Sequence, residues 1–262
     1  MQRSGSSADP RAENLGLDFS LLDARGFKEL GSIDTVLHLA WSEGFNHSTI
    51  AHLEALPSHV RFMREVALAG IGQFVGMGTM HEVGYWEGMI GEDTPTSPRS
   101  MYGIAKNALR DAARLIAEEN GSVFQWLRSY YITGDDMRNR SLFAKILQWE
   151  AEGQSTFPFN SGKSCYDFIH VSDLAEQIAV TCLQTKIRGV IECCSGTPVA
   201  LREKVQEFIH TNGLTIRPDY GAFPERPYDS PAVWGDASKI QRVFAEVPQD
   251  KASTNERSTS VG

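Results

Sequence analysis

Residues 73–79, Gln-Phe-Val-Gly-Met-Gly-Thr, form a short apolar run that two glycines interrupt and that ends in the hydroxyl of Thr79. Such a run is typical of a strand buried in a parallel sheet, where both faces are covered. In doubly wound α/β proteins, ligands bind in the crevice beyond the carboxyl ends of the strands. The segment therefore predicts a buried parallel strand that brings Thr79 to the edge of a crevice.

A helix is predicted to begin near Tyr102, 23 residues (102 − 79) after Thr79. It is rich in alanine and runs to Asn120, where Gly121 is a natural stop. On a helix, Tyr102 and Lys106 lie one turn apart and share a face. An ammonium group near a phenol lowers the pKa of the phenol from its usual value of about 10, which makes a tyrosine a usable general acid and base. We therefore expect Thr79 to hold a substrate oxygen while Tyr102 moves its proton.

Context decides whether this spacing is informative, because a tyrosine and a lysine four residues apart also occur by chance. A later segment supplies context: Asp167-Phe168-Ile169-His170-Val171-Ser172-Asp173-Leu174-Ala175. Together with the strand and the helix, it resembles the extended short-chain dehydrogenase/reductase family, which comprises nucleotide-sugar epimerases, dehydratases and ketoreductases. The resemblance covers about residues 30–245.

The resemblance implies a Rossmann-like α/β fold, a doubly wound parallel sheet with a small C-terminal substrate-binding part. It also implies NAD or NADP as the cofactor, a nucleotide sugar as the substrate and a homodimer as the assembly. In the family, the helix over residues 47–69 and the helix that begins near Tyr102 form a four-helix dimer interface. The periodicity of residues 47–69 alone fits an ordinary amphipathic helix packed on its own sheet equally well.

The chain divides into four regions. Residues 1–14 are polar and rich in serine, and we expect them to be disordered. Residues 15–160 are expected to form a partial Rossmann-like domain that binds NAD(P) and carries the catalytic residues. Residues 161–247 would complete the sheet and bind the substrate, and residues 248–262 would form a disordered tail.

Composition and charge argue against several other classes. The net charge of −8 disfavours a nucleic-acid surface. Apolar runs fall far short of the ~20 residues that a membrane helix needs, and the start of the chain is polar, so we expect a cytoplasmic protein. The four cysteines form no C-x-x-C pair and the seven histidines show no ligand spacing, so reduced thiols and no metal site are expected. His38 is expected to be a core histidine rather than a ligand.

A strand predicted over residues 34–40 has apolar residues on both faces, as in a sheet covered by helices on each side. It resembles the family's fourth strand, whose end passes under the cofactor, so the resemblance assigns Ala40 and Trp41 to cofactor binding. A further strand is predicted over residues 123–132, and there the resemblance places the backbone at Tyr130 against the nicotinamide. Tyr102 and Lys106 also contact the cofactor in this family.

The substrate side is predicted from positions where the chain departs from the family. Met80 and His81 stand where the 4,6-dehydratases have an Asp-Glu pair, and because methionine cannot transfer a proton, dehydratase chemistry is disfavoured. His81 either assists as an acid and base or lines the pocket. Tyr131 replaces an asparagine that contacts the substrate, and its hydroxyl can still bind a sugar or phosphate. Arg128 fits a structural ion pair as well as a ligand contact.

The diphosphate of the substrate needs cationic partners. The family's arginine before Asp167 is absent, since Tyr166 stands there, and Lys163 is a candidate to compensate as a point charge. The resemblance also places Arg226 on the diphosphate and Asp229 near the ribose. A guanidinium group suits a phosphate, although an exposed Pro-rich loop explains residues 226–229 equally well.

One expected element is absent from the sequence. A dinucleotide-binding domain opens with a strand, a Gly-rich turn and a helix whose N-terminus takes the pyrophosphate, yet no G-x-x-G-x-x-G precedes Asp34. We therefore expect the first three strands to be missing, through a start placed too late or a disrupted gene. Cofactor binding would be impaired, and residues 36–40 would form an exposed apolar edge.

Three functions remain open. The one we favour is an NAD(P)-dependent 4-ketoreductase or dehydrogenase that acts at C4 of a nucleotide-linked deoxysugar. The second is a nucleotide-sugar C4 epimerase, which uses the same residues and retains its cofactor. The third is a non-catalytic relative that binds a sugar nucleotide or a partner protein; the missing Gly-rich turn favours it, whereas Thr79, Tyr102 and Lys106 disfavour it.

Overall fold

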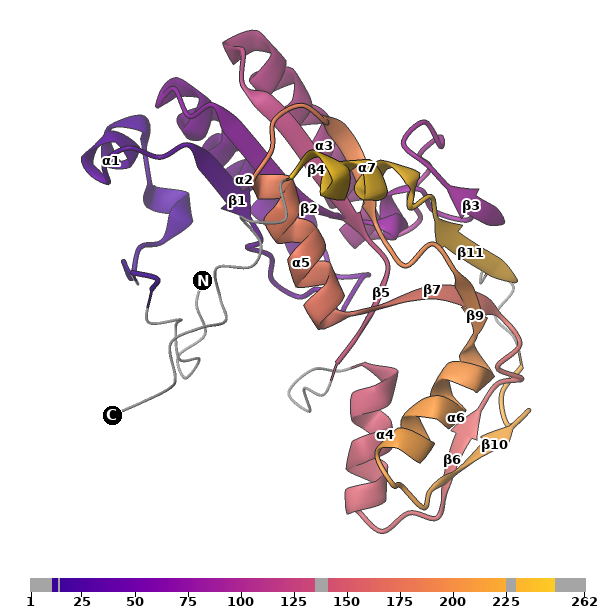
Figure 1. The fold of residues 1–262 in the computed structure, drawn as a ribbon. Helices are drawn as coiled ribbons and strands as arrows, with labels where there is room; N and C mark the ends of the chain where they lie inside the picture. Colours follow the sequence, from indigo (N-terminus) through magenta and orange to yellow (C-terminus); the bar gives the residue numbers. More distant parts are fainter. Residues whose placement is uncertain (1–10, 14, 135–140, 225–229, 248–262) are drawn as a thin grey trace, which may run out of the picture.

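The computed structural model describes residues 11–13, 15–134, 141–224 and 230–247. Its largest sheet has four parallel strands in the order β1-β2-β4-β8 (Figure 1). These strands are β1 (Thr35–His38), β2 (Gln73–Thr79), β4 (Val123–Ser129) and β8 (Gly189–Cys193). Within the described part of the chain, β1 pairs only with β2 and is therefore an edge strand.

Helices cover both faces of this sheet. The helices α2 (Ala51–Leu68) and α3 (Met101–Asn120) pack on one face, and α5 (Val171–Cys182) and α7 (Ser238–Glu246) pack on the other. Side chains of β2 alternate between two apolar clusters, because successive residues of a strand point to opposite faces. Phe74 packs with α2 and α3, and Val75 packs with α5 and α7. The predicted doubly wound α/β arrangement is confirmed.

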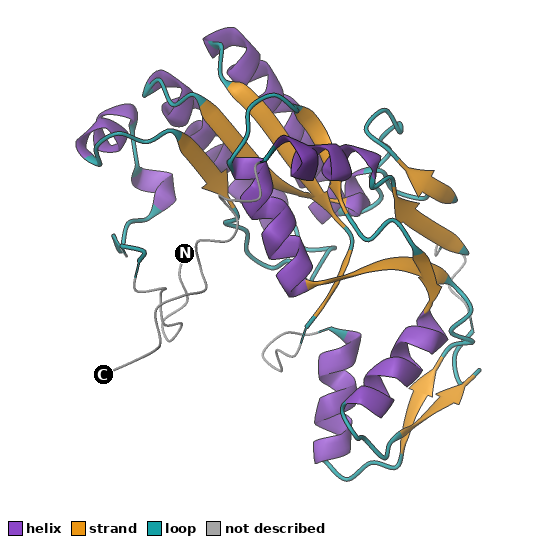
Figure 2. Cartoon of the chain, viewed as in Figure 1, coloured by secondary structure: helices purple, strands orange, loops and turns teal. Residues whose placement is uncertain are grey.

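A second sheet extends the structure beyond the carboxyl ends of the main strands. It contains β3 (Gly88–Ile90), β11 (Ala232–Gly235), β7 (Cys165–His170) and β5 (Tyr131–Thr133), with β9 (Pro198–Ala200) antiparallel to β7. A small lobe follows, in which two helices lie against a two-stranded sheet (Figure 2). It comprises α4 (Leu142–Ala151), α6 (Leu201–Thr211), β6 (Thr156–Phe159) and β10 (Arg217–Tyr220).

Three short elements complete the described chain. The 3₁₀ turn η1 (Phe19–Leu21) and the helix α1 (Ala24–Glu29) precede β1, and η2 (Met80–Glu82) follows β2 directly. The strand predicted over residues 73–79 is observed with the same bounds. The helix predicted from Tyr102 to Asn120 is α3, and Gly121 ends it with a φ of 69°.

Two predictions about elements were wrong. The strand predicted over residues 123–132 is divided at Tyr130 into β4 and β5, which pair with different sheets. The helix α5 is capped by His170, whose Nδ1 accepts from the Ser172 N–H at 3.3 Å. The strand β1 is not covered on both faces, because at the sheet edge Leu37 is 38% exposed.

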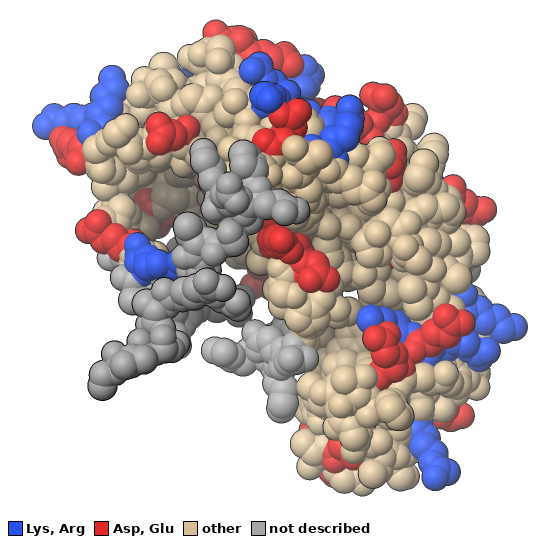
Figure 3. All heavy atoms as spheres, in the orientation of Figure 1, with Lys and Arg blue, Asp and Glu red and all other residues tan. Residues whose placement is uncertain are grey.

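The surface and the cysteines agree with the composition. On the face drawn in Figure 3, basic and acidic side chains are interspersed. No helix of the described residues is long and apolar enough to cross a membrane. The four cysteines are free thiols.

Candidate active site

Thr79 lies where β2 ends, as its sequence position predicts. Its hydroxyl accepts from the His81 N–H at 3.3 Å, and its own N–H donates to Glu82 Oε1 at 2.8 Å. These two hydrogen bonds form a capping box that begins η2 immediately after the strand. Thr79 is 5% exposed, and the hydrogen bond from the His81 N–H holds its buried hydroxyl in one direction.

Tyr102 is held in the first turn of α3. Ser100 caps this helix by accepting from the Gly103 N–H at 3.1 Å, and the Tyr102 N–H donates to the backbone oxygen of His47 at 3.1 Å. Gly103 lets α3 approach η2 closely, since a Cβ on Gly103 would lie 2.4 Å from the His81 oxygen. In this arrangement the Thr79 side chain lies close enough to the phenol of Tyr102 to act on its pKa. The structure therefore brings together the two hydroxyls that the sequence pairs.

Lys106 lies on the same face of α3, but its ammonium group is directed to the backbone of β2 and to the ring of Trp41. Nζ donates to the backbone oxygen of Met77 at 2.7 Å and lies 3.9 Å from the centroid of the Trp41 ring. Lys106 is 4% exposed, and this burial lowers its pKa to about 7, while the charge of Glu82 acts in the opposite direction. At neutral pH the protonated and unprotonated forms of Lys106 are therefore both populated.

The expected lowering of the Tyr102 pKa is not observed. Burial raises the pKa of Tyr102 to about 12; the nearby Thr79 hydroxyl opposes this shift, and the charge of Glu82 adds to it. The ammonium of Lys106 is directed to Met77 and Trp41 instead of the phenol. The phenol is therefore protonated at neutral pH in this structure.

Aromatic and imidazole rings form a wall around Tyr102. His47 stacks on Tyr102 with ring centroids 4.9 Å apart, and His81 lies edge-on to His47 at 4.4 Å. His52 and Trp41 lie 5.2 and 6.0 Å from the Tyr102 ring. Burial lowers the pKa of His47 and lowers that of His81 to about 4, so both rings are neutral near pH 7.

A second imidazole pair, His38 and His59, packs against Trp41 of this wall. His38 Nε2 and His59 Nδ1 lie 2.9 Å apart, and Trp41 stacks on His59 at 4.6 Å. The expectation that His38 is a core histidine is confirmed, since it is 6% exposed. Its partner was missed, because His59 is 21 residues away on another element and no sequence spacing relates the two. Among the described residues, no group of three or more ligating side chains could hold a metal ion.

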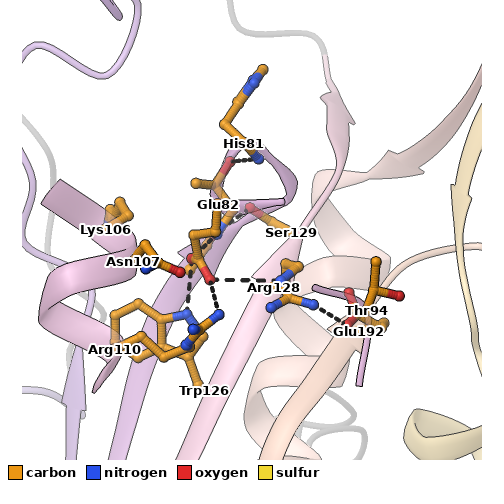
Figure 4. Close-up of polar contacts among 12 residues, drawn as sticks. His81, Glu82, Thr94, Lys106, Asn107, Arg110, Trp126, Arg128, Ser129 and Glu192 are labelled. Atoms are coloured by element: carbon orange, nitrogen blue, oxygen red, sulfur yellow. Dashed lines mark hydrogen bonds and ion pairs between the residues drawn. The ribbon is translucent and has the colours of Figure 1, made fainter. Parts of the chain in front are cut away.

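A buried charge cluster lies behind Thr79 (Figure 4). Glu82 Oε2 lies 3.4 Å from Arg110 Nη1 and 3.6 Å from Arg128 Nε, and Arg128 Nη1 donates to Glu192 Oε1 at 2.7 Å. Arg128 and Glu82 are both fully buried. For Arg128 the structure therefore supports the structural ion pair. Tyr130 also belongs to the cluster, because its hydroxyl donates to Glu192 Oε2 at 2.8 Å.

The residues predicted to contact the cofactor or the substrate lie in different parts of the fold. Ala40 and Trp41 follow β1 and lie at the same end of the sheet as Thr79. The Tyr130 side chain is directed into the charge cluster, which leaves the predicted contact of its backbone with the nicotinamide as a prediction. Tyr131 packs on Tyr166 in the second sheet, with ring centroids 4.6 Å apart.

The three predicted contacts to the diphosphate and ribose fall in two separate segments of the chain. Lys163 is exposed in the loop between β6 and β7, a loop whose Gly162 oxygen accepts from the Arg202 N–H of α6. Arg226 and Asp229 lie outside the described residues.

The described residues fit one half of a dinucleotide cofactor. Thr79, Tyr102 and the residues after β1 meet at one edge of the sheet, which suits the reacting end. For a pyrophosphate, the described residues ahead of β1 offer only α1. Its N-terminus is already capped by the Asp23 carboxylate, which accepts from the Gly26 N–H at 2.8 Å and would repel an anion.

Comparison with known proteins places this geometry in a family. Residues 5–191 match the family described as NAD dependent epimerase/dehydratase family. The chain belongs to this NAD-dependent epimerase/dehydratase family. Among similar proteins of the family is the dTDP-6-deoxy-L-talose 4-dehydrogenase (NAD(+)) of Aggregatibacter actinomycetemcomitans, 46% identical over 221 residues, which cover 83% of this chain and 80% of the relative.

The chain is also similar to a nucleotide-sugar epimerase and to a solved structure with a bound nucleotide sugar. The UDP-glucose 4-epimerase of Azospirillum brasilense is 24% identical over 241 residues, covering 83% of this chain and 69% of that protein. The solved structure of MoeE5 in complex with UDP-glucose and NAD is 25% identical, with a TM-score of 0.73, and the match covers 87% of this chain and 77% of that one.

Proposed function

We propose that this protein is an NAD-dependent 4-dehydrogenase of a nucleotide-linked 6-deoxysugar, working as a 4-ketoreductase in the reverse direction. The observation that carries the proposal is the proximity of the Thr79 hydroxyl to the phenol of Tyr102, with Lys106 on the same helix face. The 46% identity to a dTDP-6-deoxy-L-talose 4-dehydrogenase supports both the reaction and the class of substrate.

In this proposal the chain's residues handle the oxygen and the proton at C4. The Thr79 hydroxyl holds the C4 oxygen, and Tyr102 gives a proton to that oxygen or removes one. Bound NAD would exchange the hydride with C4. Because burial raises the pKa of Tyr102 to about 12, the phenol is protonated at neutral pH in the free protein. This is the state that donates a proton to the C4 oxygen when a 4-keto sugar is reduced.

The surrounding rings keep water away from the reacting oxygen. His47 and His81 flank Tyr102 as neutral groups, so they offer hydrogen bonds to the sugar without adding a positive charge. We assign His81 to the wall of the sugar pocket. Met80 beside it cannot transfer a proton, which disfavours dehydratase chemistry.

The remaining contacts are proposed from the resemblance. We assign Ala40, Trp41 and Tyr130 to cofactor binding, Tyr130 through its backbone, and Tyr131 to the substrate. Lys163, Arg226 and Asp229 would bind the nucleotide diphosphate and ribose. We also propose a homodimer in the cytoplasm, in which α2 and α3 of two protomers meet; sedimentation at the mass of a monomer would contradict the dimer.

We propose that cofactor affinity is weak, because the described residues ahead of β1 offer no uncapped helix N-terminus to a pyrophosphate. Quenching of protein fluorescence by NAD measures this affinity. Saturation at low micromolar NAD would contradict the proposal.

The second candidate is a C4 epimerase, which the similarity to a UDP-glucose 4-epimerase favours. The two reactions differ in what happens to the hydride. A dehydrogenase releases one NADH for each sugar oxidised, whereas an epimerase returns the hydride and releases none. We expect stoichiometric NADH, read by absorbance, from dTDP-6-deoxy-L-talose and added NAD. Epimerised sugar without NADH would establish the epimerase, and no change in either would favour a non-catalytic relative.

A further inference from the structure

Residues 42–49, in the loop between β1 and α2, bring the ring of His47 to the phenol of Tyr102. Most of this 42–49 loop is exposed, and Phe45 keeps 63% of its surface in contact with solvent. Glu43 has a φ of 57°, a left-handed conformation that is unfavourable for a residue with a side chain. Because the loop buries little apolar surface, hydrogen bonds to the rest of the protein are what hold it in place.

Two successive carbonyl groups of the loop bind the two helices beside it. The backbone oxygen of Asn46 lies 2.9 Å from Nε2 of His52 in α2. The backbone oxygen of His47 accepts from the Tyr102 N–H of α3 at 3.1 Å. The first N–H groups of a helix have no acceptor within that helix, so this bond satisfies an N–H of α3 as well. The 42–49 loop is thereby fixed to α2 and α3 at neighbouring peptide groups.

The partners of the His52 ring fit only one of its tautomers. The indole Nε1–H of Trp41 donates to Nδ1 of His52 at 3.2 Å, and an indole nitrogen can only donate. Nδ1 is therefore the acceptor, which leaves the proton of the neutral imidazole on Nε2. That proton is directed to the Asn46 oxygen, which can only accept. Because His52 is 2% exposed, water does not compete for either ring nitrogen.

The contacts of Asn46 and His47 position one ring, that of His47. It stacks on the phenol ring of Tyr102, with centroids 4.9 Å apart and 19° between the planes, and lies edge-on to His81. A ring stacked on the phenol restricts the directions from which a sugar can reach the phenolic oxygen. The position of the 42–49 loop therefore decides the space that is open beside Tyr102.

We propose that His52 is a positioning residue: its Nε2–H holds the 42–49 loop through Asn46, so that the ring of His47 stays stacked on Tyr102 and forms one wall of the sugar pocket. Trp41 fixes the ring proton of His52 at the nitrogen that this bond needs. The role in turnover rests on the proposed function, since Tyr102 acts on a sugar only there. The tautomer and the loop contact can be measured in the protein alone.

The first test is the tautomer of His52 in the full chain without ligands. Long-range ¹H–¹⁵N NMR of protein labelled with ¹⁵N-histidine separates a ring nitrogen that carries a proton from one that does not. The signals of His52 are those that disappear in His52→Gln. In the wild type we expect a protonated Nε2 and an unprotonated Nδ1. The opposite tautomer, or a ring with protons on both nitrogens, would overturn the proposal.

The second test is hydrogen exchange at the Tyr102 amide, whose acceptor is the His47 oxygen. His52→Phe keeps a buried ring but removes the donor to the loop. The Tyr102 amide should then exchange about tenfold faster, roughly the net contribution of one hydrogen bond. The Ile104 amide is the matched control in the same turn of α3, because its acceptor is the Ser100 oxygen and not the loop. An unchanged rate at Tyr102, or an equal acceleration at Ile104, would overturn the proposal.

His52→Gln tests whether the N–H group itself matters. The amide nitrogen of glutamine stands the same number of bonds from Cα as Nε2 of histidine, so it can donate to the Asn46 oxygen. Exchange at the Tyr102 amide should therefore return toward the wild-type rate. Exchange as fast as in His52→Phe would contradict the role of this donor. If His52→Phe does not fold, the tautomer in the wild type decides the proposal.

Turnover adds a readout that a merely structural role would not move. Partial unfolding lowers kcat in proportion to the folded fraction and leaves KM unchanged. Loss of the wall should instead raise KM for dTDP-6-deoxy-L-talose about tenfold in His52→Phe, and His52→Gln should restore it. An unchanged KM would overturn the role in substrate binding. A wild-type protein without turnover would contradict the proposed function, while the tautomer and the amide exchange would still decide how His52 holds the loop.

Discussion

The two glycines of β2 provide space for one side chain. Trp126 of β4 is fully buried and lies across the strand; a Cβ on Gly76 would be 2.5 Å from its ring, and a Cβ on Gly78 would be 2.1 Å from its Nε1. Neither glycine has the positive φ that only glycine adopts readily. Because these glycines have no side chain, the indole of Trp126 reaches Glu82, and its Nε1–H donates to the carboxylate that also binds the Thr79 N–H.

Gly78→Ala should therefore lower the free energy of unfolding by roughly 1–3 kcal/mol, the usual cost of overfilling a packed interior. Gly72→Ala is the matched control, because the nearest atom to its Cβ is 4.0 Å away and its φ is not positive. Urea denaturation of the two variants measures the difference. If Gly78→Ala were as stable as Gly72→Ala, the tight fit of Trp126 would be refuted.

At the scale of elements, a pair of neutral imidazoles joins β1 to α2. His38 and His59 share a hydrogen bond of 2.9 Å and are 6% and 3% exposed. Burial, together with the charge of the other groups, lowers the pKa of His38 to about 3 and that of His59 to about 4. One ring donates and the other accepts, so a second proton would place a charge in the apolar cluster of α2 and α3.

This pair predicts that acid destabilises the fold. Below the ordinary histidine pKa of 6.5 the unfolded chain binds protons that the folded chain refuses, so the free energy of unfolding falls as pH falls toward 4. The slope should be roughly 1 kcal/mol per pH unit for each buried histidine. Glu192, whose pKa burial raises to about 7, opposes this trend, but it is one group against these three histidines and His47, whose pKa burial also lowers.

Urea denaturation at a series of pH values measures the slope. His59→Gln should reduce it, because the variant leaves His38 with an uncharged neighbour and removes one of the titrating rings. A stability that stays level between pH 6.5 and about 5 in the wild type would show that the histidines are not neutral in the folded protein.

At the scale of the whole molecule, local patterns predicted the framework well. The strand over residues 73–79 and the helix over residues 101–120 depend on neighbouring residues, on the Ser100 cap and on the Gly121 stop, which a sequence shows directly. The division at Tyr130 was missed, because it depends on which sheet accepts each half of the segment. Long-range pairing leaves no mark in local periodicity.

The hydroxyl groups of the candidate site could be predicted from the sequence, but the buried charge cluster behind them could not. Thr79 and Tyr102 were found because each stands at the end of a regular element. The charge cluster was not, because Glu82, Arg128 and Glu192 come from three elements, with 46 residues (128 − 82) and 64 residues between them. The lowered pKa expected for Tyr102 failed for a related reason, since burial and the direction of Lys106 are properties of the folded chain.

The proposed chemistry depends on one proton carried by Tyr102. Tyr102→Phe removes that proton and keeps the ring that stacks on His47. With dTDP-6-deoxy-L-talose and added NAD, the rate of NADH formation should fall by about 10² to 10⁴ relative to the wild type, the usual loss for a general acid and base. Wild-type kcat in Tyr102→Phe, with the fold unchanged, would contradict the assignment of Tyr102 as the proton carrier.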